Sequence, residues 1–171
     1  QDDNNYFSSQ PGSLSQTDVD TDIAISGDGY FIVQGTGAPS LSRRGDLRVA
    51  DDGTLENGTS QKILNAGLQP IQVPAHRSMK VSDDGNISIE PLGSELGTEQ
   101  IIGKIALTLG TGEELKKFPD GEIRLSDGTV PPLDDNVRVL PKHLELSNVN
   151  ITEELINSIE DQRQYEINIK M

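Results

Sequence analysis

The chain has 171 residues, which suits one domain with an appendage, and carries 28 acidic against 14 basic residues for a net charge of −14. Nucleic acids and anionic membrane surfaces are bound through Lys and Arg, so this balance disfavours both as partners. Without cysteine, disulfides, thiolate nucleophiles and cysteine-ligated zinc are excluded. Apolar runs fall far short of the roughly 20 residues of a membrane span, so we expect no membrane insertion.

Residues 1–20 are polar, and Asn, Ser, Gln and Asp dominate them. We expect an extended arm there, ordered only where another part of the protein covers it. The next stretch, residues 22–34 with the sequence DIAISGDGYFIVQ, predicts two short strands around a Gly-Asp-Gly turn.

Asp-Gly and Asn-Gly pairs recur through the middle of the chain and provide the positive-φ residues that tight hairpin turns need. These pairs are at residues 52–53, 57–58, 84–85, 120–121 and 127–128. The strand candidates between them are 41–49, 62–64, 71–73, 79–81, 87–89, 101–109, 122–125 and 137–140. Since no helical period separates these strands, residues 21–146 are predicted to form a mainly β, antiparallel domain, sandwich-like or barrel-like.

Residues 147–171 are predicted to form an amphipathic α-helix at the C-terminal end of the domain. Asn150 and Glu153 have the spacing of an N-terminal capping box. One face of the helix is apolar, through Ile151, Leu155, Ile159 and Ile169.

Three polar residues of this helix, Gln162, Arg163 and Glu166, fall inside or at the edge of its apolar sector. Burying unpaired polar groups against the protein's own core costs about 1–3 kcal/mol each, so a partner helix that pairs with them is one interpretation. The other interpretation is a peripheral helix that lies against the β domain. Periodicity does not decide between the two.

Catalytic and metal-binding patterns are missing from the sequence. The Asp-rich turns at 51–53 and 83–85 lack the alternating ligands of a calcium loop. His76 and His143 lie in unrelated segments, without metal-ligand spacing or a Ser/His/Asp pattern. We therefore predict that the protein is not an enzyme and has no catalytic residue, metal, cofactor or small-molecule substrate.

Several stretches are similar to signatures of a known family. Residues 22–33, DIAISGDGYFIV, resemble the motif LDxAIxGxGFFxV, and residues 41–55 resemble YTRxGxFxxDxxGxL, with Leu41 and Leu47 at the aromatic positions. Residues 70–74, PIQVP, fit PIxxP; residues 144–150, LELSNVN, and 162–166, QRQYE, resemble LExSNVN and QRxYE. These motifs are those of the axial proteins of the bacterial flagellum, the rod and hook subunits. The chain is most similar to the proximal-rod type, with the distal-rod type next.

This resemblance implies a structural subunit of the flagellar basal-body rod that is exported by the type III apparatus and transmits torque from the motor to the hook. Partners would be copies of the chain and other rod subunits, assembled helically through paired terminal helices. This chain would lack the N-terminal helix and the last turns of the C-terminal one.

The resemblance and the helix pattern together give three groups of candidate residues. The assembly interface would comprise Ile151, Leu155, Ile159, Gln162, Arg163, Tyr165, Glu166 and Ile169. The helix start would comprise Ser147, Asn148 and Asn150, and a domain-shaping motif would comprise Asp22, Gly27, Gly29 and Phe31. Arg43 and Arg44, basic residues on an acidic chain, are candidates for an inter-subunit salt bridge.

Two other functions are weighed against the rod subunit. A secreted β-rich binding or adhesion module needs an exposed aromatic platform, and the chain has three Tyr, three Phe and no Trp. A hydrolase with paired carboxylates needs a cleft with two close acids, and no sequence pattern indicates one.

Overall fold

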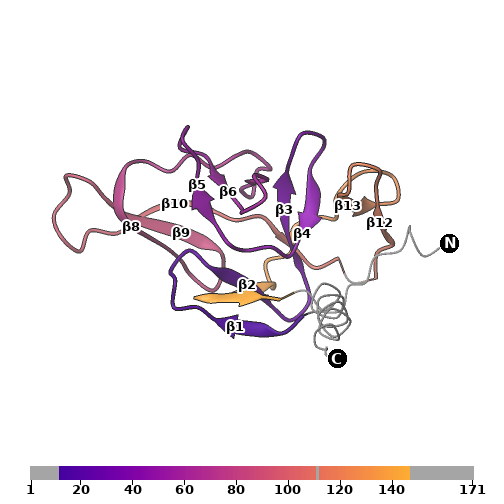
Figure 1. The fold of residues 1–171 in the computed structure, drawn as a ribbon, viewed down its shortest axis with the longest axis horizontal. Helices are drawn as coiled ribbons and strands as arrows, with labels where there is room; N and C mark the ends of the chain where they lie inside the picture. The colour runs from indigo at the N-terminus through magenta and orange to yellow at the C-terminus, as the bar shows by residue number, and fades with distance from the viewer. Residues whose placement is uncertain (1–11, 111, 147–171) are drawn as a thin grey trace, which may run out of the picture.

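A computed structural model describes residues 12–110 and 112–146, and these residues form strands and turns (Figure 1). The predicted helix at 147–171 and most of the predicted arm lie outside the described residues. The strands are β1 (Leu14–Gln16), β2 (Ile23–Ser26), β3 (Tyr30–Gln34), β4 (Ser40–Ser42), β5 (Arg48–Val49), β6 (Leu55–Glu56), β7 (Lys62–Ile63), β8 (His76–Val81), β9 (Asn86–Pro91), β10 (Gln100–Lys104), β11 (Leu107–Thr108), β12 (Leu115–Lys117), β13 (Ile123–Leu125), β14 (Arg138–Pro141) and β15 (His143–Glu145). Across the described ranges there is no helix of the length and apolarity that crossing a membrane requires.

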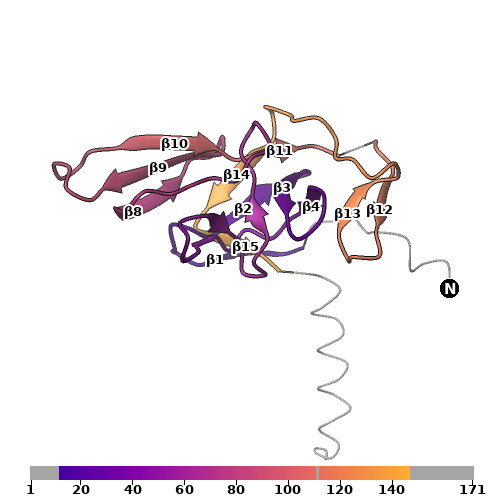
Figure 2. The same ribbon diagram turned by 90° about the horizontal axis from the view of Figure 1, so that it is seen from above.

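Every strand pairing in the described residues is antiparallel, which confirms the prediction of a mainly β, antiparallel domain. The largest sheet has the order β12-β13-β4-β3-β7-β6-β5, with β11 also paired to β3. A three-stranded sheet has the order β10-β9-β8, and two pairs, β14-β2 and β1-β15, complete the domain. The domain is elongated, with β8, β9 and β10 at one end of its long axis and β12 and β13 at the other end (Figure 2).

Strand β3 is the centre of the domain because both of its faces are buried. Phe31 and Val33 belong to the main hydrophobic core, whereas Tyr30 and Ile32 belong to a second, smaller cluster on the other face. Side chains alternate along a strand, so one continuous apolar run can fill two cores. The main core extends from β2 through β3 to β8, β9 and β14, which joins the three-stranded sheet to the rest of the domain.

Asp-Gly turns occur where the sequence predicts them, with positive φ at Gly53, Gly85, Gly121 and Gly128. The Asn57-Gly58 pair differs. In that turn the positive φ belongs to Ser60, and a Cβ on Gly58 would lie 2.2 Å from the Asp46 carboxylate. A side chain at position 58 would therefore have to displace the ends of the Asp46 and Arg44 side chains, whereas the backbone conformation does not call for glycine.

Three of the predicted strands differ in the structure. The predicted strand 41–49 is divided into β4, which pairs with β3, and β5, which pairs with β6. Residues 71–73 bury Ile71 and Val73 but form only an isolated bridge, since the prolines on either side donate no backbone hydrogen bond. The predicted strand 101–109 is divided into β10 and β11. The chain leaves β9 after Lys104 and joins β3 at Leu107, a change of partner that alternation along the sequence does not reveal.

Candidate functional site

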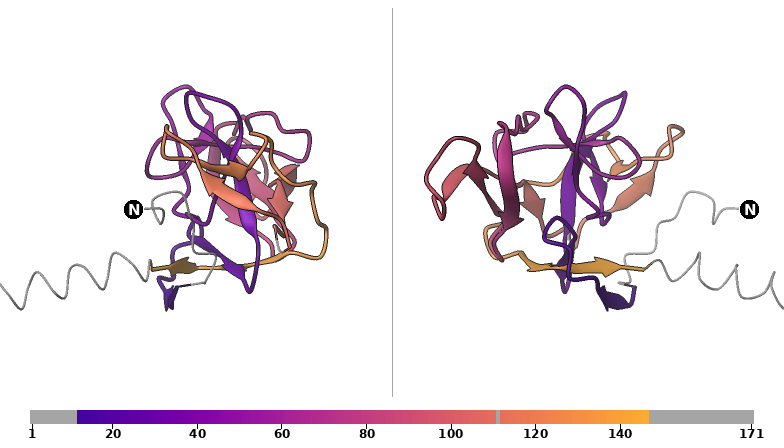
Figure 3. Two further views of the ribbon diagram at one scale, coloured as in Figure 1. Left: turned by 90° about the vertical axis from the view of Figure 1, so that its right-hand side faces the viewer. Right: turned by 60° about the vertical axis from the view of Figure 1, so that its left-hand side comes forward.

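The two ends of the described chain meet in the pair β1–β15, which we call the terminal clasp (Figure 3). Leu14 pairs with Glu145, and Gln16 pairs with His143. Beyond the strands, the Leu146 N–H donates to the Ser13 carbonyl at 2.8 Å. Residues 14–16, predicted as part of the extended arm, are thus extended and pair with β15 through their backbone, while all three residues stay exposed.

Gly12 and Leu146 show how closely the two chain segments run where they leave the described domain. A Cβ built on Gly12 would lie 1.6 Å from the Leu146 carbonyl oxygen. No side chain fits in that space, so glycine is needed for the approach. The clasp therefore brings both chain segments out of the β domain at one place.

Strand β15 is fixed to the domain through Asp22, which lies just before β2. The Asp22 carbonyl accepts hydrogen bonds from the backbone N–H groups of Lys142 and His143, at 2.6 and 3.3 Å. Lys142 has a φ of 65°, an uncommon conformation for a residue with a side chain, and it turns the chain from β14 into β15. The predicted domain-shaping residue Asp22 thus acts here through its backbone.

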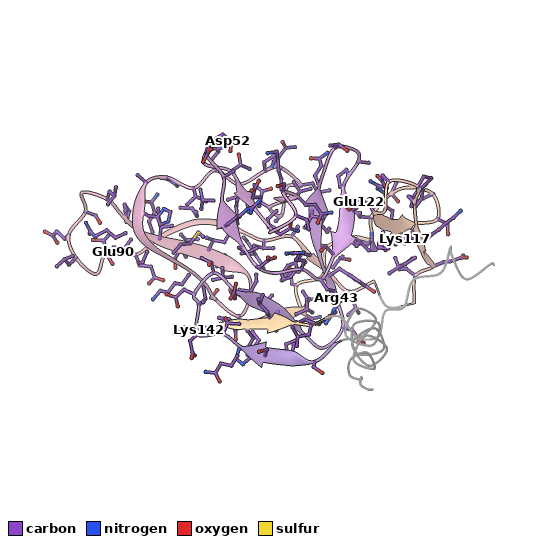
Figure 4. All side chains as sticks on the ribbon, viewed as in Figure 1. Arg43, Asp52, Glu90, Lys117, Glu122 and Lys142 are labelled. Carbon is purple, nitrogen blue, oxygen red and sulfur yellow. The ribbon has the colours of Figure 1, made fainter. Side chains whose placement is uncertain are left out.

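Glu145, the last residue of β15, forms an ion pair with Arg43, which is labelled in Figure 4. The Arg43 Nε and Nη2 atoms donate to the two carboxylate oxygens of Glu145, at 2.7 and 2.5 Å. Their side chains are only 11% and 9% exposed. Bidentate pairing in a buried setting is the strong form of this interaction, because its geometry is fixed and water is excluded.

The same guanidinium group holds the turn between β2 and β3. Arg43 Nη1 donates to the Gly29 carbonyl at 2.6 Å, and Nη2 donates to the Gly27 carbonyl at 3.0 Å. Gly27 and Gly29 have φ of 85° and 135°, which only glycine adopts readily. Phe31 follows this turn and is fully buried. The structure thus brings Gly27 and Gly29 together with Arg43 and Glu145.

A second ion pair, Arg44–Asp46, lies next to the first and is more exposed, with 2.7 Å between Arg44 Nε and Asp46 Oδ1. Burial acts to raise the pKa of the Asp46 carboxyl, but the bonds from Arg44 and from the Gly58 N–H hold that pKa below its ordinary value. The bond to Asp46 in turn raises the pKa of Arg44. Both arginines bind carboxylates within this chain, and the inter-subunit salt bridge expected of Arg43 and Arg44 stays a prediction.

No sequence pattern pairs Arg43 with Glu145, although Arg43 lies in the motif of residues 41–55 (which contains Arg-Arg-Gly-Asp) and Glu145 lies in the motif LELSNVN. The one sequence feature that could have suggested this ion pair is that the two residues have opposite charges and lie in separate family signatures. The structure thus unites three separate signatures at one ion pair: the Gly-Asp-Gly turn, the Arg-Arg-Gly-Asp segment and the Leu-Glu-Leu segment.

Other chemistry has little support in the part of the chain that the structure describes. There, no three His, Asp or Glu side chains are grouped so that they could hold a metal ion. His76 and His143 each bond a proline carbonyl nearby in sequence, Pro74 and Pro141. An aromatic platform is not formed by Tyr30 and Phe31, which are buried.

Two groups of predicted residues lie outside the described residues, so the structure does not place them. The group assigned to the assembly interface is Ile151, Leu155, Ile159, Gln162, Arg163, Tyr165, Glu166 and Ile169. The group assigned to the helix start is Ser147, Asn148 and Asn150.

Comparison with known proteins finds two matching families. Residues 24–89 match the flagellar hook protein FlgE/F/G D1 domain, and residues 140–171 match the flagellar basal body rod FlgEFG protein C-terminal family. The first match contains the β2–β3 turn and Arg43, and the second match contains Glu145. The Arg43–Glu145 ion pair therefore joins the two matched regions.

Curated relatives align with nearly the whole chain. The flagellar basal-body rod protein FlgF of Salmonella typhimurium is 30% identical over 168 residues, which cover 94% of this chain and 66% of the relative. FlgF of Escherichia coli is 32% identical with the same coverage, and the rod protein FlgG of Buchnera aphidicola is 32% identical over 93% of this chain and 62% of the relative. The chain thus spans just under two thirds of the length of these relatives.

Proposed function

Because this chain belongs to the family of flagellar rod and hook proteins, with FlgF foremost among the rod members it resembles, we propose that it is a structural subunit of the basal-body rod. It assembles helically with copies of itself and with proximal and distal rod subunits. The assembled rod transmits torque from the motor to the hook. Export by the flagellar type III apparatus brings the subunit to the periplasm-spanning rod.

The terminal clasp is the observation that supports this role best. A subunit whose two terminal segments pair with each other in the centre of a tube must release both segments from its outer domain at one place. Gly12 and Leu146 lie in contact where the two segments leave the described domain. The Arg43–Glu145 pair makes this exit rigid by fixing β15 to the β2–β3 turn.

Residues 147–171 form the C-terminal helix of the subunit in this proposal. Its cap comprises Ser147, Asn148 and Asn150, and its apolar face packs on a partner helix. Polar residues in that face, among them Gln162, Arg163 and Glu166, pair across the helix interface. Support comes from the match of residues 140–171 to the rod C-terminal family and from the helical spacing of the apolar residues.

Substitution of the apolar face tests the proposal. The double change Leu155→Asp and Ile159→Asp, made in the gene of the intact protein, is expected to abolish motility and to leave basal bodies without a complete rod and hook in electron micrographs. A charge buried in a helix interface is uncompensated, so assembly cannot tolerate it. The thermal unfolding of the β domain is expected to stay nearly unchanged.

Asn157→Asp together with Gln164→Asp, on the opposite face of the helix, is the matched control and should leave cells motile. Motile cells with complete hooks in the Leu155→Asp and Ile159→Asp strain would show that the rod role is wrong. A large fall in the melting temperature of the β domain would instead show that the helix packs on its own domain.

A further inference from the structure

The end of the domain formed by residues 91–101, which we call the tip, exposes three large apolar side chains. Leu92 is 59% exposed, Ile101 is 65% exposed and Leu96 is 86% exposed, and these are the three most exposed large hydrophobic residues of the described chain. Single exposed apolar residues need no explanation, but three of this exposure within ten residues are unusual. Exposed apolar side chains gathered in one segment favour contact with another surface.

The tip is an ordered loop and not a loose one. Arg77 donates from Nη2 to the Ser94 carbonyl at 2.6 Å and from Nε to Glu90 at 2.9 Å. The Glu90 carboxylate also accepts from the Gly97 N–H at 3.1 Å, and Ser94 Oγ donates to the Pro91 carbonyl at 2.7 Å. A loop held in one conformation before contact loses less entropy when it binds, so its exposed leucine can act as an anchor.

The opposite end of the domain carries the complementary charge. Glu90 in the tip region and Lys117 on β12 are far apart along the long axis of the molecule (Figure 4). Beside the leucines of the tip, Glu95 and Glu99 are exposed, and on β12 Lys116 and Lys117 are exposed. None of these four makes an ion pair within the described ranges.

An aromatic side chain accompanies the two lysines. Phe118 is partly exposed, and its ring has Lys116 Nζ at 5.9 Å and the Arg124 guanidinium at 5.3 Å from its centroid. Glu113 and Glu114 are exposed in the turn before β12, so the basic character belongs to the strand itself. One end thus offers leucine with acid, and the other offers phenylalanine with base.

Both ends also present the edge of a sheet. In the described residues, β10 is the last strand of the three-stranded sheet, and β12 is the last strand of the large sheet. An edge strand has backbone N–H and C=O groups without a ladder partner. The edge of β10 carries Ile101, and within the described ranges only its last carbonyl, that of Lys104, already accepts a bond, from the Ala66 N–H at 3.1 Å. The two edges could therefore join in addition to the side-chain contacts.

From these observations we infer that copies of this chain make an end-to-end contact in which the tip of one copy docks on β12 of the next. Leu96 packs against Phe118, and Glu95 and Glu99 face Lys116 and Lys117. The contact is heterologous, because different surfaces meet, and so it continues into an open series of subunits. It rests on the proposed rod function and assigns that assembly a second contact, separate from the terminal helices.

Disulfide cross-linking tests this contact in solution, since the chain has no cysteine of its own. Thr98→Cys places a thiol at the tip and Glu114→Cys places one beside β12, and both leave the leucines and lysines intact. The two variants are mixed in equal amounts, one with an affinity tag so that the mixed dimer has its own mass, and oxidised at high concentration. Asp51→Cys, at an exposed turn on another part of the domain, is the control partner.

The mixed Thr98→Cys and Glu114→Cys dimer is expected to exceed the dimer formed with Asp51→Cys. Adding Glu95→Lys and Glu99→Lys to the tip variant should reduce this dimer about fivefold, as expected for the loss of two exposed ion pairs. Adding Lys116→Glu and Lys117→Glu to its partner should restore it. Leu96→Ser in the tip variant should reduce it as well, without change in thermal unfolding.

Three results would overturn the end-to-end contact. The first is a Thr98→Cys variant that dimerises with itself as readily, which indicates a symmetric tip contact. The second is equal cross-linking to the Asp51→Cys variant, and the third is no mixed dimer above that control. Each leaves the motility test of the rod role unaffected, because that test depends on the terminal helix alone.

Discussion

The terminal clasp and the tip use the same chemical device in opposite ways. In both, one arginine binds a glutamate and donates to two carbonyl groups of a glycine-containing loop. Arg43 binds Glu145 and the carbonyls of Gly27 and Gly29, whereas Arg77 binds Glu90 and the carbonyls of Ser94 and Glu95. At the clasp the pair is nearly buried, and at the tip it is about one quarter exposed.

The difference lies in what surrounds each pair. The loop at the clasp leads into Phe31 and the main core, so the ion pair fixes the path of the chain. The loop at the tip leads into exposed leucines, so its ion pair fixes a surface. A buried pair left with one partner keeps an uncompensated charge, whereas an exposed pair exchanges its partner for water. The same contact therefore has very different energetic weight in the two places.

Removing each arginine in turn is the most direct test of the difference in stability between the two ion pairs. Arg43→Met is expected to lower the free energy of unfolding by about 3 kcal/mol, because Glu145 stays buried without its counter-charge. Arg77→Met should lower it by less than about 1 kcal/mol. Chemical denaturation of both variants beside the unchanged chain measures the difference.

The double change Arg43→Met with Glu145→Gln is the control for this prediction. It removes the buried charge together with its partner, so part of the lost stability should return. Equal costs for Arg43→Met and Arg77→Met would show that burial does not separate the two pairs.

Sequence patterns were sufficient for the fold class because the physics of turns and strands is local. Asp-Gly pairs at 52–53, 84–85, 120–121 and 127–128 form the positive-φ turns expected of them. The alternation before the Gly-Asp-Gly turn and the β-rich run after it likewise identified β2 and β3. Segment 71–73 differs because the prolines on either side remove backbone donors, and segments 41–49 and 101–109 differ because the chain changes partner strand.

The clasp could not be predicted because it depends on contacts between residues about a hundred positions apart. Arg43 and Glu145 belong to separate signatures, and neither signature contains information about the other's position in space. At Gly12 it is the approach of Leu146, far along the chain, that makes a side chain impossible. Resemblance to a family indicated that these segments matter, and the structure shows how they meet.

Glycine substitutions in the clasp and in the tip compare the two regions again, with smaller expected losses of stability. Gly12→Ala should separate β1 from β15 near Leu146 and cost about 1–2 kcal/mol, the value of one or two backbone hydrogen bonds. Gly93→Ala at the tip has open space around its Cβ but a φ of 84°, so strain of about 1 kcal/mol is expected there without displacement of a neighbour.

Amide hydrogen exchange distinguishes the two glycines. The Leu146 amide, which donates to the Ser13 carbonyl, should exchange faster in the Gly12→Ala variant and at its original rate in the Gly93→Ala variant. Unchanged protection of Leu146 in the Gly12→Ala variant would mean that the two chain segments do not depend on this close approach.

The mildest test uses pH and concerns the tip alone. The Gly97 N–H bond and the Arg77 guanidinium together hold the pKa of Glu90 below its ordinary value of 4.5. A carboxyl whose pKa is lowered by folding contributes stability above its unfolded pKa and loses that contribution as the pH falls through its folded pKa. The order of the loop should therefore persist at pH 5 and decrease only below about pH 4.5.

Nuclear magnetic resonance can follow this change at one atom. The Gly97 amide proton, which donates to Glu90, should shift with a midpoint below 4.5 as the carboxyl is protonated. Glu90→Gln should remove that titration and leave the clasp amides, such as Leu146, unaffected. A Gly97 amide that titrates at or above 4.5 would show that Glu90 does not hold the loop, and the ordered tip would then need another cause.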